Sequence, residues 1–444
     1  MKVCFVSHSS DKMGAERTLL ELIDALNLHS VECYAILPSK GILLEALKRR
    51  CRGWSVIPFD WWMGPSGGNA KVRPTIYHHL DRSVRIAEQI RVWECALVYT
   101  NTITICVGAL AARLLGLTHV WHIQEYGPEH HGITFDLGED FSLWLLDQFS
   151  SACIANSHAV GQKYQPLLGP GKLRVIYGAV TVSPKSLVEE PFNPLSNDAD
   201  TIRCVMVGAI QEGKRQDEAI QAIAELARAG KRVELTIVGP SSDLRYRGYL
   251  RALIAEHRLK EAVKFTGYVE NPLSIVQSAD VALICSRYEA FGRVTVEAMR
   301  AGKPVIGARS GGTPELIQDG FNGLLYTPGD HRELAEKISY LHKNAQLART
   351  MGQNGLQWAN EHFSEKRFGD EVFRLLNELL SQTQALNVAD RYLIELQRKR
   401  LWQLQPKQRK SWEYSRIGRA WRTLTQEGPQ NLVRKGWQKL IHRD

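Results

Sequence analysis

Two glutamates stand eight residues apart, on either side of a glycine, in the segment SRYEAFGRVTVEAMRAGKPVIGARSGGTPE. They are Glu289 and Glu297, and the glycine is Gly292. The apolar run VALIC before this segment is expected to form a strand that ends at Cys285. The loop 286–292 then lies at the carboxyl end of a strand, where open α/β sheets bind ligands. Because carboxylates accept hydrogen bonds from vicinal hydroxyls, the pattern favours ribose or hexose hydroxyls as partners.

A helix is expected to begin near Arg293, directly after Gly292. Its first N–H groups would point back at the loop and form an anion site that suits a diphosphate. Gly311 and Gly312 follow the next predicted strand and permit a second close backbone approach. Two glutamates at this spacing are by themselves most often solvated surface acids, so it is the surrounding glycines and helix start that indicate a ligand site.

Strands and helices alternate through most of the 444 residues, which is enough chain for two to three domains. Strands are predicted at 2–7, 31–37, 96–100, 119–123, 153–155, 203–207, 233–238, 263–266, 281–284 and 304–308, with helices at 15–27, 103–115, 139–149 and 216–229. This alternation predicts the α/β class, with doubly wound parallel sheets covered by helices on both faces.

Residues 183–200 hold three prolines and several acids without periodicity, and they are the predicted linker. We therefore expect one Rossmann-like domain over residues 1–185 and a second Rossmann-like domain over 201–362. A helix at 363–385 is expected to pack back on the first domain. Residues 386–444 form a basic tail that contains tryptophan.

The string E-x7-E with AFG, VEAM, AGKPVI and GGTPEL is similar to the nucleotide-sugar site of the retaining family 4 glycosyltransferases, which have the GT-B fold. The resemblance covers roughly residues 1–380. It implies two Rossmann-like domains that face a cleft, with residues 1–185 on the acceptor side and residues 201–362 as the nucleotide-sugar domain. In that family the second glutamate holds the nucleotide ribose, which implies Glu297, and the first contacts the donor sugar, which implies Glu289.

The resemblance also implies further donor contacts. Backbone groups around Phe291, Gly292 and Arg293 would contact the sugar and the diphosphate. The loop GAIQEGK resembles the loop after the first strand of the second domain, where a lysine compensates the diphosphate charge. This implies roles for Gly208 and Lys214.

Three other stretches resemble the family at matching positions. Gly267 and Tyr268 correspond to the loop that packs on the nucleobase. Gly14 corresponds to the glycine loop of the first domain, and His122 to a histidine near the donor sugar. The resemblance thus implies Glu289, His122 and Lys214 as the catalytic residues, without a named catalytic base.

The sequence departs from the family pattern at two loops. Met13 stands where the family has the first of two glycines, and Ala209 stands where an arginine is common. The second change removes a cation from the diphosphate site, unless Arg215 or Arg293 replaces it.

The implied activity is that of a retaining glycosyltransferase of class EC 2.4. It would move sugar from a nucleotide-sugar donor to a glycan or lipid-linked acceptor in surface polysaccharide synthesis. No cofactor is expected and no metal site is predicted, since the family does not require metal. One alternative is a catalytically degenerate GT-B binding or scaffold subunit, which Ala209 and Met13 favour. Another is a sugar-nucleotide epimerase, which the E-x7-E string disfavours.

The charge of the chain is concentrated at its end. Residues 391–444 hold 14 basic and 4 acidic residues, whereas the whole chain has a net charge of +9. A nearly neutral body argues against a nucleic-acid enzyme. Within residues 414–443, tryptophans and basic residues line predicted amphipathic helices, a pattern typical of an anionic membrane surface. Packing on the protein's own body or on a partner fits equally well, and nucleic acid is the least favoured partner.

No run approaches the roughly 18 apolar residues of a spanning helix, and no signal peptide is recognised. The eight cysteines contain no C-x-x-C pair and are interpreted as reduced core thiols. These features predict a cytoplasmic protein, and the membrane-binding alternative for the tail would place it peripherally on the inner face of the membrane. They do not predict an oligomeric state.

Overall fold

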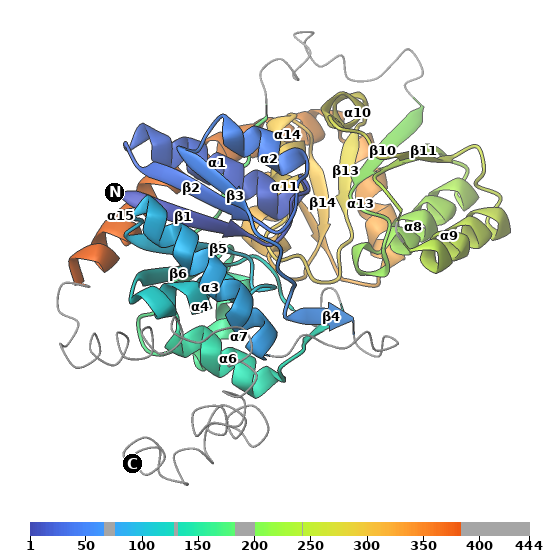
Figure 1. Ribbon diagram of the computed structural model, residues 1–444. Helices are drawn as coiled ribbons and strands as arrows, with labels where there is room; N and C mark the ends of the chain where they lie inside the picture. Colours follow the sequence, from blue (N-terminus) through green and yellow to red (C-terminus); the bar gives the residue numbers. More distant parts are fainter. Residues whose placement is uncertain (66–75, 128–131, 183–199, 242, 383–444) are drawn as a thin grey trace, which may run out of the picture. The chain divides into compact units, whose positions relative to one another are not determined.

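The structure is a computed structural model that describes residues 1–65, 76–127, 132–182, 200–241 and 243–382. It divides into two compact units (Figure 1). Unit 1 comprises Met1–Asn156, Gly161–Ile176 and the chain from Gly369 on, and unit 2 comprises Ser157–Val160 and Tyr177–Phe368.

Unit 1 is built on a seven-stranded sheet in the order β3-β2-β1-β5-β6-β8-β9, in which all neighbours are parallel (Figure 1). Its strands are β1 (Lys2–Ser7), β2 (Glu32–Leu37), β3 (Gly53–Val56), β5 (Leu97–Asn101), β6 (Thr118–Ile123), β8 (Ala152–Ala155) and β9 (Leu173–Val175). The helices of this part are α1 (Gly14–Leu28), α2 (Ile42–Lys48), α3 (Ile76–Trp93), α4 (Val107–Leu115) and α6 (Glu139–Gln148), together with α7 (His158–Tyr164) from Gly161 on. The short strands β4 (Met63–Pro65) and β7 (Ile133–Phe135) form an antiparallel pair beside them.

Unit 2 is built on a six-stranded parallel sheet in the order β12-β11-β10-β13-β14-β15 (Figure 1). Its strands are β10 (Thr201–Val207), β11 (Arg232–Val238), β12 (Val263–Gly267), β13 (Val281–Ile284), β14 (Val305–Ala308) and β15 (Gly323–Tyr326). Its helices are α8 (Gln216–Arg228), α9 (Leu244–Glu256), α10 (Leu273–Ser278), α11 (Arg293–Arg300), α12 (Thr313–Leu316), α13 (His331–Lys343) and α14 (Ala345–His362).

Both faces of the second sheet are buried. Along β10, Cys204 and Met206 belong to one apolar cluster, whereas Val205 between them belongs to another. Successive side chains of a strand point to opposite faces, so the two clusters lie on the two sides of the sheet. Helices therefore cover both faces, as the alternation of strands and helices in the sequence predicted.

The predicted strands are confirmed to within two residues at each end. The helix predicted from residue 103 instead begins at Val107. Thr102 has a positive φ of 75°, and the Ile103 N–H donates to the Glu125 carboxylate at 3.2 Å. Residues 102–106 thus form a loop, although their apolar composition suits a helix. All eight cysteines are free thiols and seven are buried, as predicted for core residues.

The last described helix, α15 (Glu365–Gln382), belongs to unit 1 from Gly369 on. His29, the C-cap of α1, pairs with Asp370 at 2.9 Å, and its ring stacks on Phe373 at 4.4 Å between centroids. A Cβ at Gly369 would lie 2.6 Å from the Cβ of Ala25, so the two helices approach closely there. The predicted amphipathic tail at 386–444 lies outside the described residues. In the described part of the chain, no helix is both long and apolar enough to cross a bilayer.

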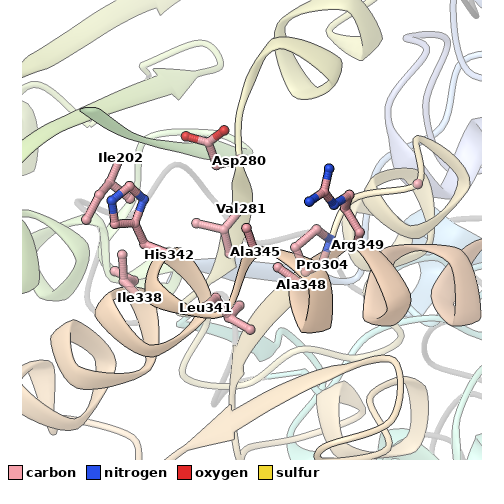
Figure 2. Close-up of a pocket in the computed structure, with 11 residues that line it drawn as sticks. Ile202, Asp280, Val281, Pro304, Ile338, Leu341, His342, Ala345, Ala348 and Arg349 are labelled. Atoms are coloured by element: carbon pink, nitrogen blue, oxygen red, sulfur yellow. The ribbon is translucent and has the colours of Figure 1, made fainter. Parts of the chain in front are cut away.

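A cavity of about 50 Å³ lies at the amino ends of β10, β13 and β14 (Figure 2). Its wall is mainly apolar, with Asp280 before β13 and Arg349 on α14 as charged members. The residues predicted to bind the donor follow the opposite, carboxyl ends of these parallel strands, so the cavity is separate from them.

Candidate active site

Three glycines end three neighbouring strands of unit 2. Gly208 follows β10, Gly239 follows β11, and Gly267 is the last residue of β12. Their φ values are all positive, at 147°, 153° and 75°. The Gly208 N–H donates to the Val238 carbonyl at 2.8 Å, and the Gly239 N–H donates to the Gly267 carbonyl at 2.9 Å. A Cβ at Gly239 would lie 2.0 Å from the Gly208 carbonyl oxygen, so only glycine fits. Tyr268, which follows Gly267, is 65% exposed and does not belong to the apolar core.

Lys214 and Glu289 meet across two neighbouring loops. Lys214 ends a short 3₁₀ helix after β10, and Glu289 lies in the loop after the adjacent strand β13. The Lys214 Nζ donates to Glu289 Oε2 at 2.7 Å, and both side chains are mostly buried. The Arg287 N–H also donates to the Gly213 carbonyl at 2.9 Å. The fold therefore brings two predicted site residues into direct contact.

The Gly311-Gly312 pair supports the Glu289 loop. The Gly312 N–H donates to the Glu289 carbonyl at 2.7 Å. A Cβ at Gly311 would lie 2.4 Å from that carbonyl oxygen, and one at Gly312 would lie 2.7 Å from the carbonyl oxygen of Ala290. The close approach predicted for these glycines is thus made by the protein's own loop, which they hold in place.

Helix α11 begins where the predicted anion site requires it. Gly292 is its N-cap, with a left-handed φ of 96°, and Glu297 lies one turn into the helix, half-buried. Phe291 is buried and packs edge-on against Phe363, with 5.6 Å between ring centroids. The Phe291 ring belongs to the apolar core, which leaves its backbone groups as the part of this residue that could contact the donor.

The two arginines considered as replacement cations both have partners within unit 2. Arg293 donates to the carbonyl of Ala179 at 2.9 Å. Arg215 lies 3.4 Å from Asp217 and 3.6 Å from Glu218. Burial lowers the pKa of Arg215, but these two carboxylates outweigh it and raise the pKa overall. Lys214, the third cation of this loop region, contacts the predicted site residue Glu289.

The predicted residues of unit 1 lie at the carboxyl edge of its sheet. His122 is fully buried on β6, edge-on to Tyr99, and burial lowers its pKa to about 3, so its imidazole is neutral. Gly14 is the first residue of α1. Met13 has an extended conformation with a φ of −93°, and its N–H donates to the Glu16 carboxylate at 3.0 Å. The replacement of the first glycine of the pair by Met13 therefore causes no backbone strain.

Sequence reasoning missed several polar residues at the same edge. His8 Nε2 lies 3.2 Å from Glu16 Oε1. The Glu125 carboxylate accepts from the N–H groups of Ile103 and Gln124 at 3.2 and 3.3 Å, and burial raises its pKa to about 7. The available signal was position, because His8 and Glu125 follow directly after buried strands.

Glu315 of α12 is a further residue that sequence reasoning missed. Its carboxylate accepts from the N–H groups of His158 and Ala159, both at 2.7 Å, and from the Tyr177 hydroxyl at 2.6 Å. All four residues belong to unit 2. One carboxylate thus anchors two separate segments of the chain. In the portion of the chain that the structure describes, no cluster of three or more His, Cys, Asp or Glu side chains could hold a metal ion.

Two family models match the two halves of the chain. Residues 13–183 match the model of Glycosyltransferase Family 4, and residues 188–358 match that of Glycosyl transferases group 1. Together with the two parallel α/β sheets, these matches show that the chain belongs to the family 4 glycosyltransferases with the GT-B fold. The fold class and the family predicted from the sequence are confirmed.

Relatives match over different shares of their length. The chain is 24% identical over 380 residues to the lipopolysaccharide core biosynthesis glycosyltransferase LpsE of Rhizobium meliloti, covering 85% of this chain and 99% of LpsE. It is 27% identical over 252 residues to the N-acetyl-alpha-D-glucosaminyl L-malate synthase of Bacillus anthracis, covering 55% of this chain and 65% of that protein. Four curated relatives, this one included, are matched over 26–65% of their own length.

The fold also matches solved structures. The crystal structure of Anabaena HepE in complex with UDP-glucose has a TM-score of 0.68 and 25% sequence identity, covering 85% of this chain and 100% of HepE. Sucrose-phosphate synthase from Thermosynechococcus elongatus has a TM-score of 0.65 at 17% identity, covering 86% of this chain and 100% of that one, which is a likeness of fold.

Proposed function

We propose that the chain is a retaining glycosyltransferase that moves a sugar from a nucleotide-sugar donor to a glycan or lipid-linked acceptor in surface polysaccharide synthesis. The observation that carries the proposal is the contact between Lys214 and Glu289 at the carboxyl edge of the second sheet, beside the start of α11. A cation, a sugar-binding carboxylate and a helix N-terminus are the groups that transfer from a sugar diphosphate needs.

Each group has a distinct task in this proposal. The Lys214 ammonium and the first N–H groups of α11 stabilise the negative charge that develops on the leaving diphosphate. Glu289 accepts hydrogen bonds from hydroxyls of the donor sugar, and Glu297 accepts them from the ribose. Tyr268, which is exposed beside the glycine turns, packs on the nucleobase. These positive groups make a metal ion unnecessary in the proposal, so transfer should persist in EDTA.

The donor is proposed to be a UDP-sugar. HepE, which shares the fold over 85% of this chain, is described in complex with UDP-glucose. A catalytically degenerate scaffold subunit was favoured by Met13 and Ala209. The relaxed backbone at Met13 and the Lys214–Glu289 contact both support an active enzyme over that alternative.

A thermal-shift panel with UDP, GDP, ADP and CMP tests the donor site. Of the four nucleotides, we expect only UDP to stabilise the protein, by about 2.7 kcal/mol at a UDP concentration of 100 times its dissociation constant. Glu297→Ala should remove this stabilisation, whereas Glu256→Ala, an exposed glutamate on α9, should keep it. If none of the four nucleotides stabilises the protein, the donor site as assigned is wrong and the scaffold becomes the better interpretation.

The stereochemistry of transfer is tested separately. Once a UDP-sugar and an acceptor give product, the anomeric configuration of the new bond follows from its proton NMR coupling constant. A product with the anomeric configuration of the donor supports the retaining mechanism, and the opposite configuration contradicts it.

A further inference from the structure

The carboxyl edge of the first sheet carries an indole that is both exposed and held in place. Trp61 is 40% exposed, whereas its neighbour Trp62 is fully buried. The Trp61 Nε1–H donates to the His8 carbonyl at 2.8 Å, and its ring contacts the His8 imidazole with 5.4 Å between centroids. Tryptophan is a largely buried residue type, so an exposed indole fixed at two points is unusual.

The support beneath Trp61 is itself anchored. His8 Nε2 lies 3.2 Å from Glu16 Oε1, and the other oxygen of Glu16 accepts from the Met13 N–H at 3.0 Å. The buried carboxylate of Glu16 thus links the start of α1 to His8, and His8 in turn holds Trp61. Because the ring is positioned before any ligand arrives, little conformational freedom is lost on binding.

Other exposed apolar side chains follow the neighbouring strands. Met13 lies in the loop after β1, and Ile42 begins the helix after β2, and both are exposed. The two loops are joined, because the Leu43 N–H donates to the Ser10 carbonyl at 3.0 Å. These apolar side chains therefore lie at the same edge of the sheet as His8, which holds Trp61.

A carboxylate stands next to the indole in the chain. Asp60 precedes Trp61, is 58% exposed, and lies 2.6 Å from His78 Nε2 through one oxygen. A carboxylate has about four acceptor positions, so the contact with His78 leaves capacity for ligand hydroxyls.

We infer that Trp61 is the stacking platform for a pyranose ring of the acceptor and that Asp60 accepts hydrogen bonds from hydroxyls of that ring. The inference rests on the proposed function, since it names the acceptor subsite of that reaction. The indole N–H is already used by His8, so the ring offers a ligand only its π surface. The negative face of an aromatic ring attracts the positively polarised C–H groups on one side of a pyranose. An exposed carboxylate beside it matches the hydroxyls at the edge of the sugar better than it matches a lipid chain.

Saturation-transfer difference NMR on the full-length protein tests this assignment. The probes are the methyl glycosides of glucose, galactose, mannose and N-acetylglucosamine. We expect at least one to receive saturation on its ring C–H protons. Trp61→Ala should weaken its binding by about two- to tenfold, the range of an aromatic stacking contact. Trp54→Ala is the matched control, because Trp54 is 43% exposed on β3 and contacts Lys48 instead.

The UDP thermal shift, measured on the same variants, separates folding and donor binding from the acceptor subsite. Trp61→Phe keeps a ring without the N–H and should retain part of the glycoside binding. Three outcomes would overturn the inference when UDP still stabilises the protein. The first is that no glycoside binds. The others are that glycoside binding is unchanged in Trp61→Ala, or that Trp54→Ala reduces it equally. Saturation confined to the alkyl chain of octyl glucoside would also overturn it, in favour of a lipid site. If glycoside binding depends on Trp61 but UDP does not stabilise the protein, the inference stands and the proposal of a UDP-sugar donor is contradicted.

Discussion

The Lys214 ammonium donates to Glu289 Oε2 at 2.7 Å, although the two residues are 75 positions apart in the chain. The contact exists because β10 and β13 are neighbours in the sheet, so the loops at their carboxyl ends adjoin. It couples the proposed diphosphate cation to the proposed sugar ligand. A bound donor would bring its own charges to both groups, so the pair is expected to rearrange on binding.

Replacing Lys214 by alanine should slow transfer from a UDP-sugar by about 100- to 1,000-fold, because a charge-stabilising donor contributes about 2.7–4 kcal/mol to the transition state. Steady-state kinetics measure this loss as a decrease in kcat. Lys231→Ala, an exposed lysine of unit 2, is the control and should leave kcat within about twofold. A Lys214→Ala enzyme with normal kcat would contradict the assigned role.

A double-mutant cycle on Lys214→Ala and Glu289→Gln measures the coupling between the two side chains. Groups in direct contact show interaction energies of about 0.5–3 kcal/mol. Urea unfolding of the four proteins without nucleotide gives this energy for the contact seen in the structure. Strict additivity would mean that the ion pair contributes nothing to stability.

Glu125 should make stability depend on pH. Its pKa is about 7 in the folded chain because burial disfavours the carboxylate, and about 4.5 is its ordinary value. Between these values the folded state binds more protons, so the stability due to this group falls as pH rises from about 4.5 to 7. Glu125→Gln should therefore be more stable than wild type at pH 8 by up to about 3 kcal/mol, and the difference should shrink toward pH 5. Thermal unfolding of both proteins across this range checks the sign, and a constant difference would refute the shift.

Gly239→Ala should destabilise unit 2 strongly. The new Cβ would lie 2.0 Å from the Gly208 carbonyl oxygen, and the φ of 153° is strained for alanine. We expect a loss of about 3 kcal/mol or more in urea unfolding. Gly248→Ala provides the contrast. Gly248 lies within α9 with open space around it, so alanine should stabilise that helix by up to about 1 kcal/mol.

Glu315→Ala should loosen the segments that its carboxylate anchors. It removes three hydrogen bonds to a charged acceptor, and we expect a loss of about 3 kcal/mol. Hydrogen exchange gives a local test, because the amides of His158 and Ala159 should exchange faster. Glu336→Ala, an exposed glutamate on α13, should change neither quantity. Unchanged protection at these two amides would show that the anchor is dispensable.

Much of the fold follows from local patterns. The longer strands β1, β10 and β11 were predicted because their apolar residues are consecutive or alternate with polar ones, as is typical of strands. The short strands β3, β4, β7, β9 and β15 were missed. Each has only three or four residues, and β3 and β9 are also incompletely buried, so the apolar signal is short or weak.

Part of the candidate donor site could also be predicted from local sequence, and part required the tertiary structure. Glu289, Gly292 and the start of α11 could be located from one continuous segment, because a strand end, a glycine and a helix start are local features. Only the tertiary structure placed Lys214 on Glu289 and gave Arg215 and Arg293 partners within unit 2, since these contacts join segments far apart in the chain.

The contacts that hold Trp61 in place could not be recognised from the chain alone. His8, Glu16 and Trp61 come from three separate segments, with no shared motif or spacing. Parallel strand order brings their loops to one edge, and burial then decides that Trp62 enters the core while Trp61 stays exposed. Local sequence thus specifies which elements form and where each ends. The packing of the sheets decides which of the residues at those ends come together.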